Sequence, residues 1–116
     1  MTNKREGVNA ELFLKIAERV ENDPDSYDQK YVARDPGIYG GCIFCHAEEI
    51  LGLSHFEGEE TVSGLVPSRK TVEALGLDAE DAIRLYSSRW KPKPEYTVPA
   101  ALRAIAGGAS VQEVSQ

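Results

Sequence analysis

The sequence predicts an all-α fold, a compact single domain of four to five short helices with a long N-proximal connecting loop. Apolar residues recur at three- and four-residue steps in several short segments, each bounded by residues typical of helix caps and stops. No segment shows a convincing strand alternation, and there is no internal repeat. A chain of 116 residues, 41% of them hydrophobic, has enough apolar material for one core.

The first helix is predicted to begin after Asn9, which acts as its N-cap, and to end at the Asn22-Asp23-Pro24 stop. Residues 23–41 then form a connection rich in Asp, Pro and Gly. Its aromatic residues are expected to cover the core, because an unanchored loop of this length is unusual. The helix presents one apolar stripe, formed by Val8, Leu12, Phe13, Ile16, Ala17 and Val20.

A second helix is predicted from about Gly41 to Leu51, with Gly52 as a left-handed C-cap. Because cysteine is among the most buried residue types, we expect this helix to be central. Residues 52–67 are expected to form a loop with an acidic patch. One helix face is predicted to carry Ile43, Phe44, Ala47, Ile50 and Leu51, with Glu48 and Glu49 pointing elsewhere.

Two short helices follow, the first capped by Ser68 and ended by Gly76, and the second capped by Asp78. The inner face of the second is predicted to hold Ala82, Ile83, Leu85 and Tyr86. The glycine turn between them is typical of a helix-turn-helix. Acidic residues at the start of the second helix disfavour contact with DNA phosphates, so we expect a helical hairpin without a DNA-reading function.

The segment from Ser87 to Pro94 is predicted to be an irregular basic linker anchored by Trp90. A last helix is expected to open at Thr97-Val98-Pro99 and to close at Gly107-Gly108. The single helical domain is therefore predicted to span residues 1–108. Residues 109–116 are expected to be a loosely ordered C-terminal tail.

The net charge of −6 disfavours nucleic acids and anionic membranes as partners. Residues 1–66 carry thirteen acids against six bases, whereas residues 67–93 carry six bases against four acids. The N-terminal residues lead into no apolar signal segment, and no apolar run approaches the ~18–20 residues needed to span a bilayer. We therefore expect a cytoplasmic protein with reduced thiols.

The pentapeptide Cys42-Ile43-Phe44-Cys45-His46 has the spacing of a c-type haem attachment site, with His46 as the proximal ligand. The expected second ligand, a methionine or histidine, leaves only His55, because the sole methionine is Met1. On a helix, Cys42, Cys45 and His46 are also placed to face one zinc ion, with His55 or Glu49 as a fourth ligand. Neither a second zinc knuckle nor an export signal accompanies the motif.

A thioredoxin-like redox pair is a third interpretation, since a helix N-terminus lowers the pKa of a thiol. That chemistry is typically preceded by a strand, and a Gly-rich segment stands here instead. The favoured interpretation is that Cys42 and Cys45 pack as small hydrophobic residues, with the ring of His46 partly wet at the helix margin. No cofactor is then expected, with zinc or haem c as the alternative.

The sequence has no Ser-His-Asp arrangement, phosphate-binding glycine loop or isolated carboxylate pair, so no enzymatic activity is predicted. The favoured function is a small acidic protein-interaction or accessory factor. The alternative is a metal- or haem-binding module built on Cys42, Cys45, His46 and His55. The candidate partner-binding residues are Arg89, Trp90, Lys91 and Lys93 in the basic segment and Glu57, Glu59 and Glu60 in the acidic loop.

From about Leu12 to Ile105 the spacing resembles a group of small, uncharacterised helical proteins of actinobacteria and their phages. The resemblance implies a phage or actinobacterial accessory factor, possible host interaction, and no known site residues. The family pattern for the second helix reads Ala-Cys-Ile-Ala-Gly-Trp-Ala, and this chain has Cys45 and His46 in place of its Gly and Trp. The resemblance therefore implies that the C-x-x-C-H motif arose by substitution in a helix whose role is packing. The matching segments are Asp23-Pro24-Asp25-Ser26-Tyr27, Gly41-Cys42-Ile43-Phe44-Cys45-His46-Ala47, Ala74-Leu75-Gly76-Leu77, Trp90-Lys91-Pro92 and Ala101-Leu102-Arg103.

Overall fold

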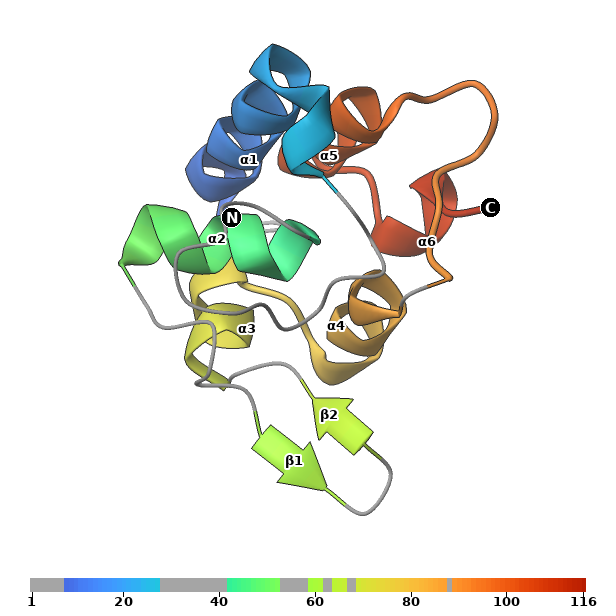
Figure 1. Ribbon diagram of the computed structural model, residues 1–116. Helices are drawn as coiled ribbons and strands as arrows, with labels where there is room; N and C mark the ends of the chain where they lie inside the picture. The colour runs from blue at the N-terminus through green and yellow to red at the C-terminus, as the bar shows by residue number, and fades with distance from the viewer. Residues whose placement is uncertain (1–7, 28–41, 53–58, 62–63, 67–68, 88) are drawn as a thin grey trace, which may run out of the picture.

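The computed structural model describes residues 8–27, 42–52, 59–61, 64–66, 69–87 and 89–116 (Figure 1). Within these ranges the chain forms six α-helices, one 3-10 turn and one two-stranded hairpin, and the predicted all-α single domain is confirmed. No helix in the described ranges has both the length and the apolar character needed to cross a membrane. In chain order the elements are α1 (Ala10–Asn22), η2 (Pro24–Ser26), α2 (Ile43–Leu51), β1 (Glu59–Thr61), β2 (Gly64–Val66), α3 (Arg69–Leu75), α4 (Ala79–Tyr86), α5 (Val98–Ala106) and α6 (Val111–Val114).

Helix α1 begins and ends where the sequence predicts. The side chain of Asn9 accepts a hydrogen bond from the backbone N–H of Leu12 at 3.1 Å, which satisfies one of the open donors of the first turn. At the other end, Asp23 leaves the helical conformation and Pro24 starts η2. The predicted apolar stripe is confirmed by the residues that α1 buries, which are Leu12, Phe13, Ile16, Ala17 and Val20.

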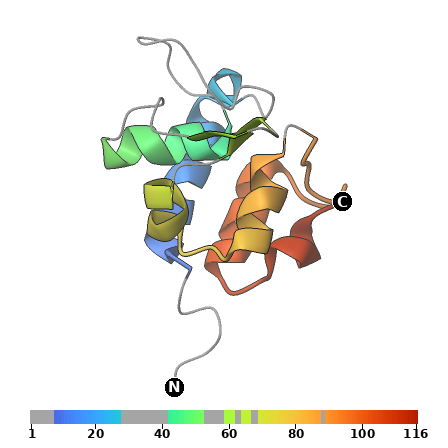
Figure 2. The same cartoon turned by 90° about the horizontal axis from the view of Figure 1, so that it is seen from below.

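Helices α1 and α5 lie side by side although they come from opposite halves of the chain (Figures 1 and 2). Thr97 caps α5 by accepting from the backbone N–H of Ala100 at 3.2 Å. On the exposed side of the pair, the guanidinium of Arg103 donates to both carboxylate oxygens of Glu21, at 2.7 and 2.9 Å. Apolar side chains from both helices are part of the same hydrophobic core.

Helix α2 is the central helix, and it is buried on almost every side from Cys42 to Glu48. It contacts α1, α3 and α4, so a polar face could not be maintained. The predicted orientation is therefore wrong at two positions: the Glu48 side chain is 5% exposed and that of Leu51 is 40% exposed. The hydroxyl of Thr71 in α3 donates to the buried Glu48 carboxylate at 3.3 Å. Gly52 ends the helix with φ +75°, as predicted.

Helices α3 and α4 are joined by a short turn at Gly76, whose φ is +73°. The carboxylate of Asp78 caps α4 by accepting from the backbone N–H of Asp81 at 2.8 Å. Ala82 and Leu85 face the core, but Ile83 is 68% exposed, so its predicted place on the inner face is wrong. Consecutive helical residues are rotated by about 100°, and the burial of Ala82 turns its neighbour outward.

A small antiparallel hairpin lies within the 52–67 segment that the sequence analysis assigns to a loop. In its register Glu59 pairs with Val66, Glu60 with Leu65 and Thr61 with Gly64. Figure 1 shows the hairpin at the end of the molecule away from α1 and α5. It is too short to have produced a recognisable alternation in the sequence.

The C-terminal residues are ordered, and the expectation of a loose tail from Ala109 to Gln116 is not met. Ser110 and Glu113 form a reciprocal capping box at the start of α6, with bonds of 3.0 and 2.9 Å. The backbone N–H groups of Lys93 and Gln116 donate to Val114 and Lys91, which ties the predicted linker to the chain end. The side chains of Val111 and Val114 are fully buried and complete the core.

Candidate functional site

The predicted Cys-x-x-Cys-His motif occupies the start of α2, deep in the core. Cys42 is the N-cap residue, with φ −75° and ψ 178°, and its sulfur makes no capping hydrogen bond. Neither Cys42 nor Cys45 forms a disulfide, and neither has exposed surface, as the packing interpretation predicts. Their Sγ atoms are 3.8 Å apart. The Cys45 thiol holds the pKa of Cys42 below its ordinary value, although burial acts in the opposite direction.

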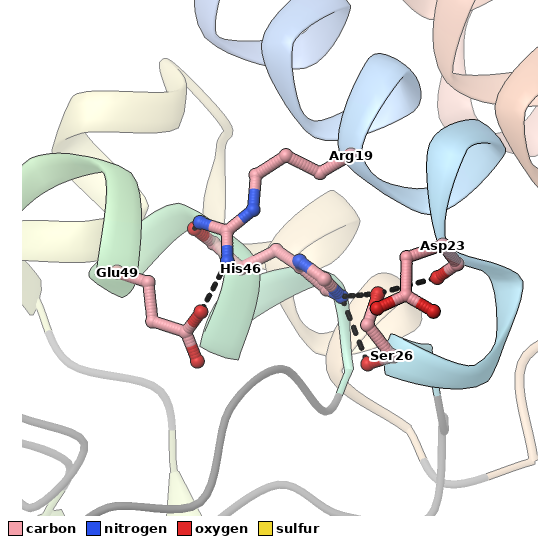
Figure 3. A network of polar contacts seen from close by, with 5 residues as sticks. All are labelled: Arg19, Asp23, Ser26, His46 and Glu49. Atoms are coloured by element: carbon pink, nitrogen blue, oxygen red, sulfur yellow. Dashed lines mark hydrogen bonds and ion pairs between the residues drawn. The ribbon is translucent and has the colours of Figure 1, made fainter.

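His46 is fully buried, so the prediction that its ring is partly wet is wrong. Its ring extends from α2 towards η2, where Nε2 lies 3.0 Å from the backbone oxygen of Ser26 (Figure 3). A carbonyl oxygen only accepts, so in the neutral imidazole Nε2 carries the proton. The other ring nitrogen, Nδ1, is buried with no hydrogen-bond partner among the described residues. Burial lowers the pKa of His46 from its ordinary value of 6.5, because the charged ring has lost its water.

A polar network around His46 joins α1, η2 and α2, and the sequence analysis did not identify it. Arg19 of α1 forms an ion pair with Glu49 and also donates to the backbone oxygen of His46 at 3.5 Å (Figure 3). The Ser26 hydroxyl donates to the backbone oxygen of Asp23 at 2.7 Å. The pattern of residues gave no signal for these contacts, since each joins positions far apart in the chain or depends on the η2 turn.

The ligands of the zinc interpretation do not come together in the described part of the chain. No three His, Cys, Asp or Glu side chains among those residues converge on one point. The Nε2–H of His46 donates to the backbone oxygen of Ser26, which leaves only Nδ1 of this ring for a metal ion. His55, which both the zinc and the haem interpretations use, lies outside the described residues. The metal- or haem-binding alternative therefore stays a prediction.

The basic segment predicted to contact a partner forms one wall of an open groove of about 380 Å³. Trp90 lies in its floor: the side chain is 7% exposed, and the indole N–H donates to the Ser115 hydroxyl at 2.8 Å. The prediction that Trp90 anchors the segment is confirmed, whereas its burial makes it a poor contact residue. The groove is lined by Glu80, Ile83, Arg84, Ser87, Arg89, Trp90, Lys91, Ser115 and Gln116.

Arg89 and Lys91 lie together on the groove, while Lys93 is half-buried and is not part of its lining. Arg84, which the sequence analysis did not select, joins them from α4. Its Nε is buried and has no hydrogen-bond partner within the described ranges. The sequence contained a signal for Arg84 as a contact residue, because it stands three residues before Ser87, where the basic segment begins. Of the predicted acidic contact residues, Glu59 and Glu60 lie in β1 and Glu57 lies outside the described residues.

Comparison of the chain with protein-family models, with curated proteins and with solved structures found no significant match. The resemblance to small helical proteins of actinobacteria and their phages therefore stays a prediction.

Proposed function

We propose that the protein is an interaction domain that binds an acidic segment of another protein in the groove beside α4. The segment would place an apolar side chain on Ile83 and carboxylates on the surrounding cations. The observation that carries the proposal is the position of Ile83, which is 68% exposed and lines the groove together with Arg84, Arg89 and Lys91.

The charge of the groove supports an acidic partner. Among the side chains that line the groove are three cations and one carboxylate, that of Glu80. The whole chain carries −6. Charged groups separated by less than about 8 Å are only partly screened at physiological salt, so these cations attract an incoming carboxylate.

Arg84 gives the groove a specific donor. The guanidinium is planar and binds carboxylates through two parallel hydrogen bonds, and the terminal Nη atoms would be the donors because Nε is buried. Arg89 and Lys91 are exposed and adjust to the position of further acidic groups. Interfaces often place such charges around a central apolar anchor, which is the arrangement of Ile83 and its neighbours.

The floor of the groove is rigid enough to act as a binding surface. Trp90 is fixed by its hydrogen bond to Ser115, and the Ser115 hydroxyl in turn donates to the backbone oxygen of Val111. A preformed surface loses little conformational freedom on binding, so more of the contact energy appears as affinity.

The test begins with selection of binders from a random peptide library displayed on the surface of a carrier. We expect enriched sequences to combine acidic residues with an aliphatic or aromatic residue. The affinity of a selected peptide is then measured by the fluorescence of Trp90, the only tryptophan in the chain. Ile83→Ser and the double variant R89E/K91E are each expected to weaken binding about tenfold or more, equivalent to about 1.4 kcal/mol.

Leu14→Ser and Lys15→Glu are the matched controls, because both residues are exposed on α1 and neither lines the groove. They are expected to leave the affinity unchanged. Enrichment of basic or uncharged peptides, or equal binding by the groove variants and the controls, would overturn the proposal. Tighter binding of a single-stranded oligonucleotide than of any selected peptide would also reject it in favour of a nucleic-acid ligand.

A further inference from the structure

The two cysteines form a second candidate site, independent of the groove. Cys42 precedes α2 and Cys45 is its third residue, so the extended backbone of the N-cap lets the Cys42 side chain lie over the first turn. The two sulfurs are in van der Waals contact at 3.8 Å, and the Cys42 thiol donates a weak hydrogen bond to the Cys45 sulfur. Neither sulfur is part of a disulfide.

This contact is close to the geometry that a disulfide requires. A disulfide needs an S–S distance of about 2.0 Å and Cβ atoms about 3.5–4.5 Å apart. The sulfurs must therefore approach by roughly 1.8 Å, which requires rotation of both side chains together with adjustment of the backbone at the start of α2.

We propose that Cys42 and Cys45 are a reversible dithiol–disulfide site that exchanges with low-molecular-weight disulfides. The Cys42 thiolate attacks one sulfur of the small disulfide, which forms a mixed disulfide and releases one thiolate. The Cys45 thiolate then attacks the Cys42 sulfur, closes the protein disulfide and releases the second thiolate. Two electrons pass to the small molecule, and the two protons lost by the cysteines are taken up by the released thiolates.

Cys42 is the attacking residue for two reasons. It lies at the N-terminus of a nine-residue helix, where the backbone N–H groups favour a negative charge. Once it is deprotonated, the Cys45 thiol donates a hydrogen bond to it and keeps its pKa below the ordinary value. Tyr86 lies nearby, with its ring against Phe44, and its pKa is raised by burial and by the negative charge of Cys42, so the phenol stays protonated.

Burial makes the reaction dependent on local opening of the first turn. Neither cysteine is exposed, and the backbone N–H of His46 donates to the Cys42 oxygen at 3.1 Å. Opening breaks this bond and lets the small disulfide reach Cys42. The site is therefore expected to respond to the equilibrium ratio of thiol to disulfide over long incubation, and the test is made at equilibrium.

The full chain is equilibrated under native conditions at a series of ratios of reduced to oxidised glutathione. After quenching with acid, free thiols are alkylated and the mass is measured. We expect a monomeric species to grow with oxidised glutathione in which both alkylation sites are lost and two hydrogen atoms are missing. It should disappear when the ratio is reversed. Two alkylated thiols at every ratio, or oxidation only to covalent dimers, would overturn the proposal.

Single variants test the order of attack. Cys45→Ala retains the attacking thiol and is expected to accumulate the mixed disulfide with glutathione, whereas Cys42→Ala is expected to react more slowly. Equal rates of reaction with oxidised glutathione for the two variants would contradict the assignment of Cys42 as the nucleophile. Circular dichroism shows whether each variant is folded. If a variant does not fold, the glutathione titration of the wild-type chain still decides whether the disulfide forms.

Discussion

The indole N–H of Trp90 donates a hydrogen bond of 2.8 Å to the hydroxyl of Ser115, across a sequence separation of 25 residues. The same hydroxyl donates to the backbone oxygen of Val111 within α6. The Ser115 side chain thus supplies a partner both for the indole N–H of Trp90 and for the backbone oxygen of Val111. This relationship attaches the C-terminal helix to the basic segment and fixes the floor of the groove.

Substitution of Ser115 by alanine is expected to destabilise the protein more than its small volume suggests. The variant leaves the buried indole N–H without a partner, and such a group costs about 1–3 kcal/mol. The measurement is the free energy of unfolding from a denaturant titration monitored by circular dichroism. Gln112→Ala, at an exposed position in α6, is the control and should have little effect. Equal unfolding midpoints for Ser115→Ala and wild type would refute the role given to this hydrogen bond.

Removal of residues 110–116 is expected to lower the free energy of unfolding by roughly 3–6 kcal/mol. The deletion exposes the surfaces that Val111 and Val114 cover, and each fully buried valine contributes about 1.5–3 kcal/mol. Removal of Gln116 alone is the control, because this residue is exposed and contributes one backbone hydrogen bond. A loose tail, by contrast, would be removable without change in the unfolding midpoint.

Trp90 and its neighbours Arg89 and Lys91 are expected to respond differently to substitution. Trp90→Ala should cost about 3–5 kcal/mol of stability, because it removes a large buried side chain. Arg89→Ala and Lys91→Ala should leave stability within about 0.5 kcal/mol, since both side chains are exposed. Thermal unfolding of the three variants makes this comparison. It also determines which substitutions are suitable for binding experiments, because a loss of binding in Trp90→Ala would reflect unfolding.

Acidification is expected to destabilise the protein through His46. Its pKa is lowered in the folded state, so below about pH 6.5 the unfolded chain takes up a proton that the folded chain does not. The free energy of unfolding should therefore fall as the pH falls from about 6.5 towards the folded-state pKa. One such proton gives a slope of at most about 1.4 kcal/mol per pH unit.

His46→Gln is the matched variant for this experiment, because the glutamine amide keeps an N–H donor for the backbone oxygen of Ser26. The difference between its stability curve and that of wild type isolates the contribution of His46 from those of the carboxylates and of His55. Parallel curves between pH 7 and the acid transition would show that His46 is not responsible.

The ends of the helices could be predicted from the sequence because capping depends on neighbouring residues. Asn9, Asp78 and Thr97 each precede a helix, and each accepts a backbone N–H of the first turn. The stop at Pro24 and the left-handed Gly52 follow from backbone constraints of the same local kind. These features need no knowledge of the rest of the fold.

The direction in which short helices face could not be predicted with the same success. Helices of eight or nine residues give only two turns of periodicity, so the neighbours in the fold decide which side is buried. Glu48 is enclosed because α3 supplies Thr71 as a partner, and Ile83 is exposed because Ala82 and Leu85 fit the core. The groove depends on that exposed isoleucine, which explains why the sequence indicated only its basic wall.

Helix α6 shows a different difficulty. The Ser110-x-x-Glu113 spacing is a capping-box signal, but a four-residue helix gives no periodic pattern to support it. Its two buried valines are explained only by the cavity that the core offers them. The helical spacing of Cys42 and Cys45 indicated that their side chains lie close together. Their complete burial depends on the packing of α1, α3 and α4 around α2.

The pairing of α1 with α5 determines when this protein can fold. Arg103 and Glu21 are 82 positions apart, and the helices that carry them form the most extensive contact between elements in the described part of the chain. A chain emerging from the ribosome exposes the apolar stripe of α1 until residue 106 and beyond have been synthesised. Because closing so long a segment carries a large entropic cost before any contact is gained, we expect folding to be late and slow for a small helical protein.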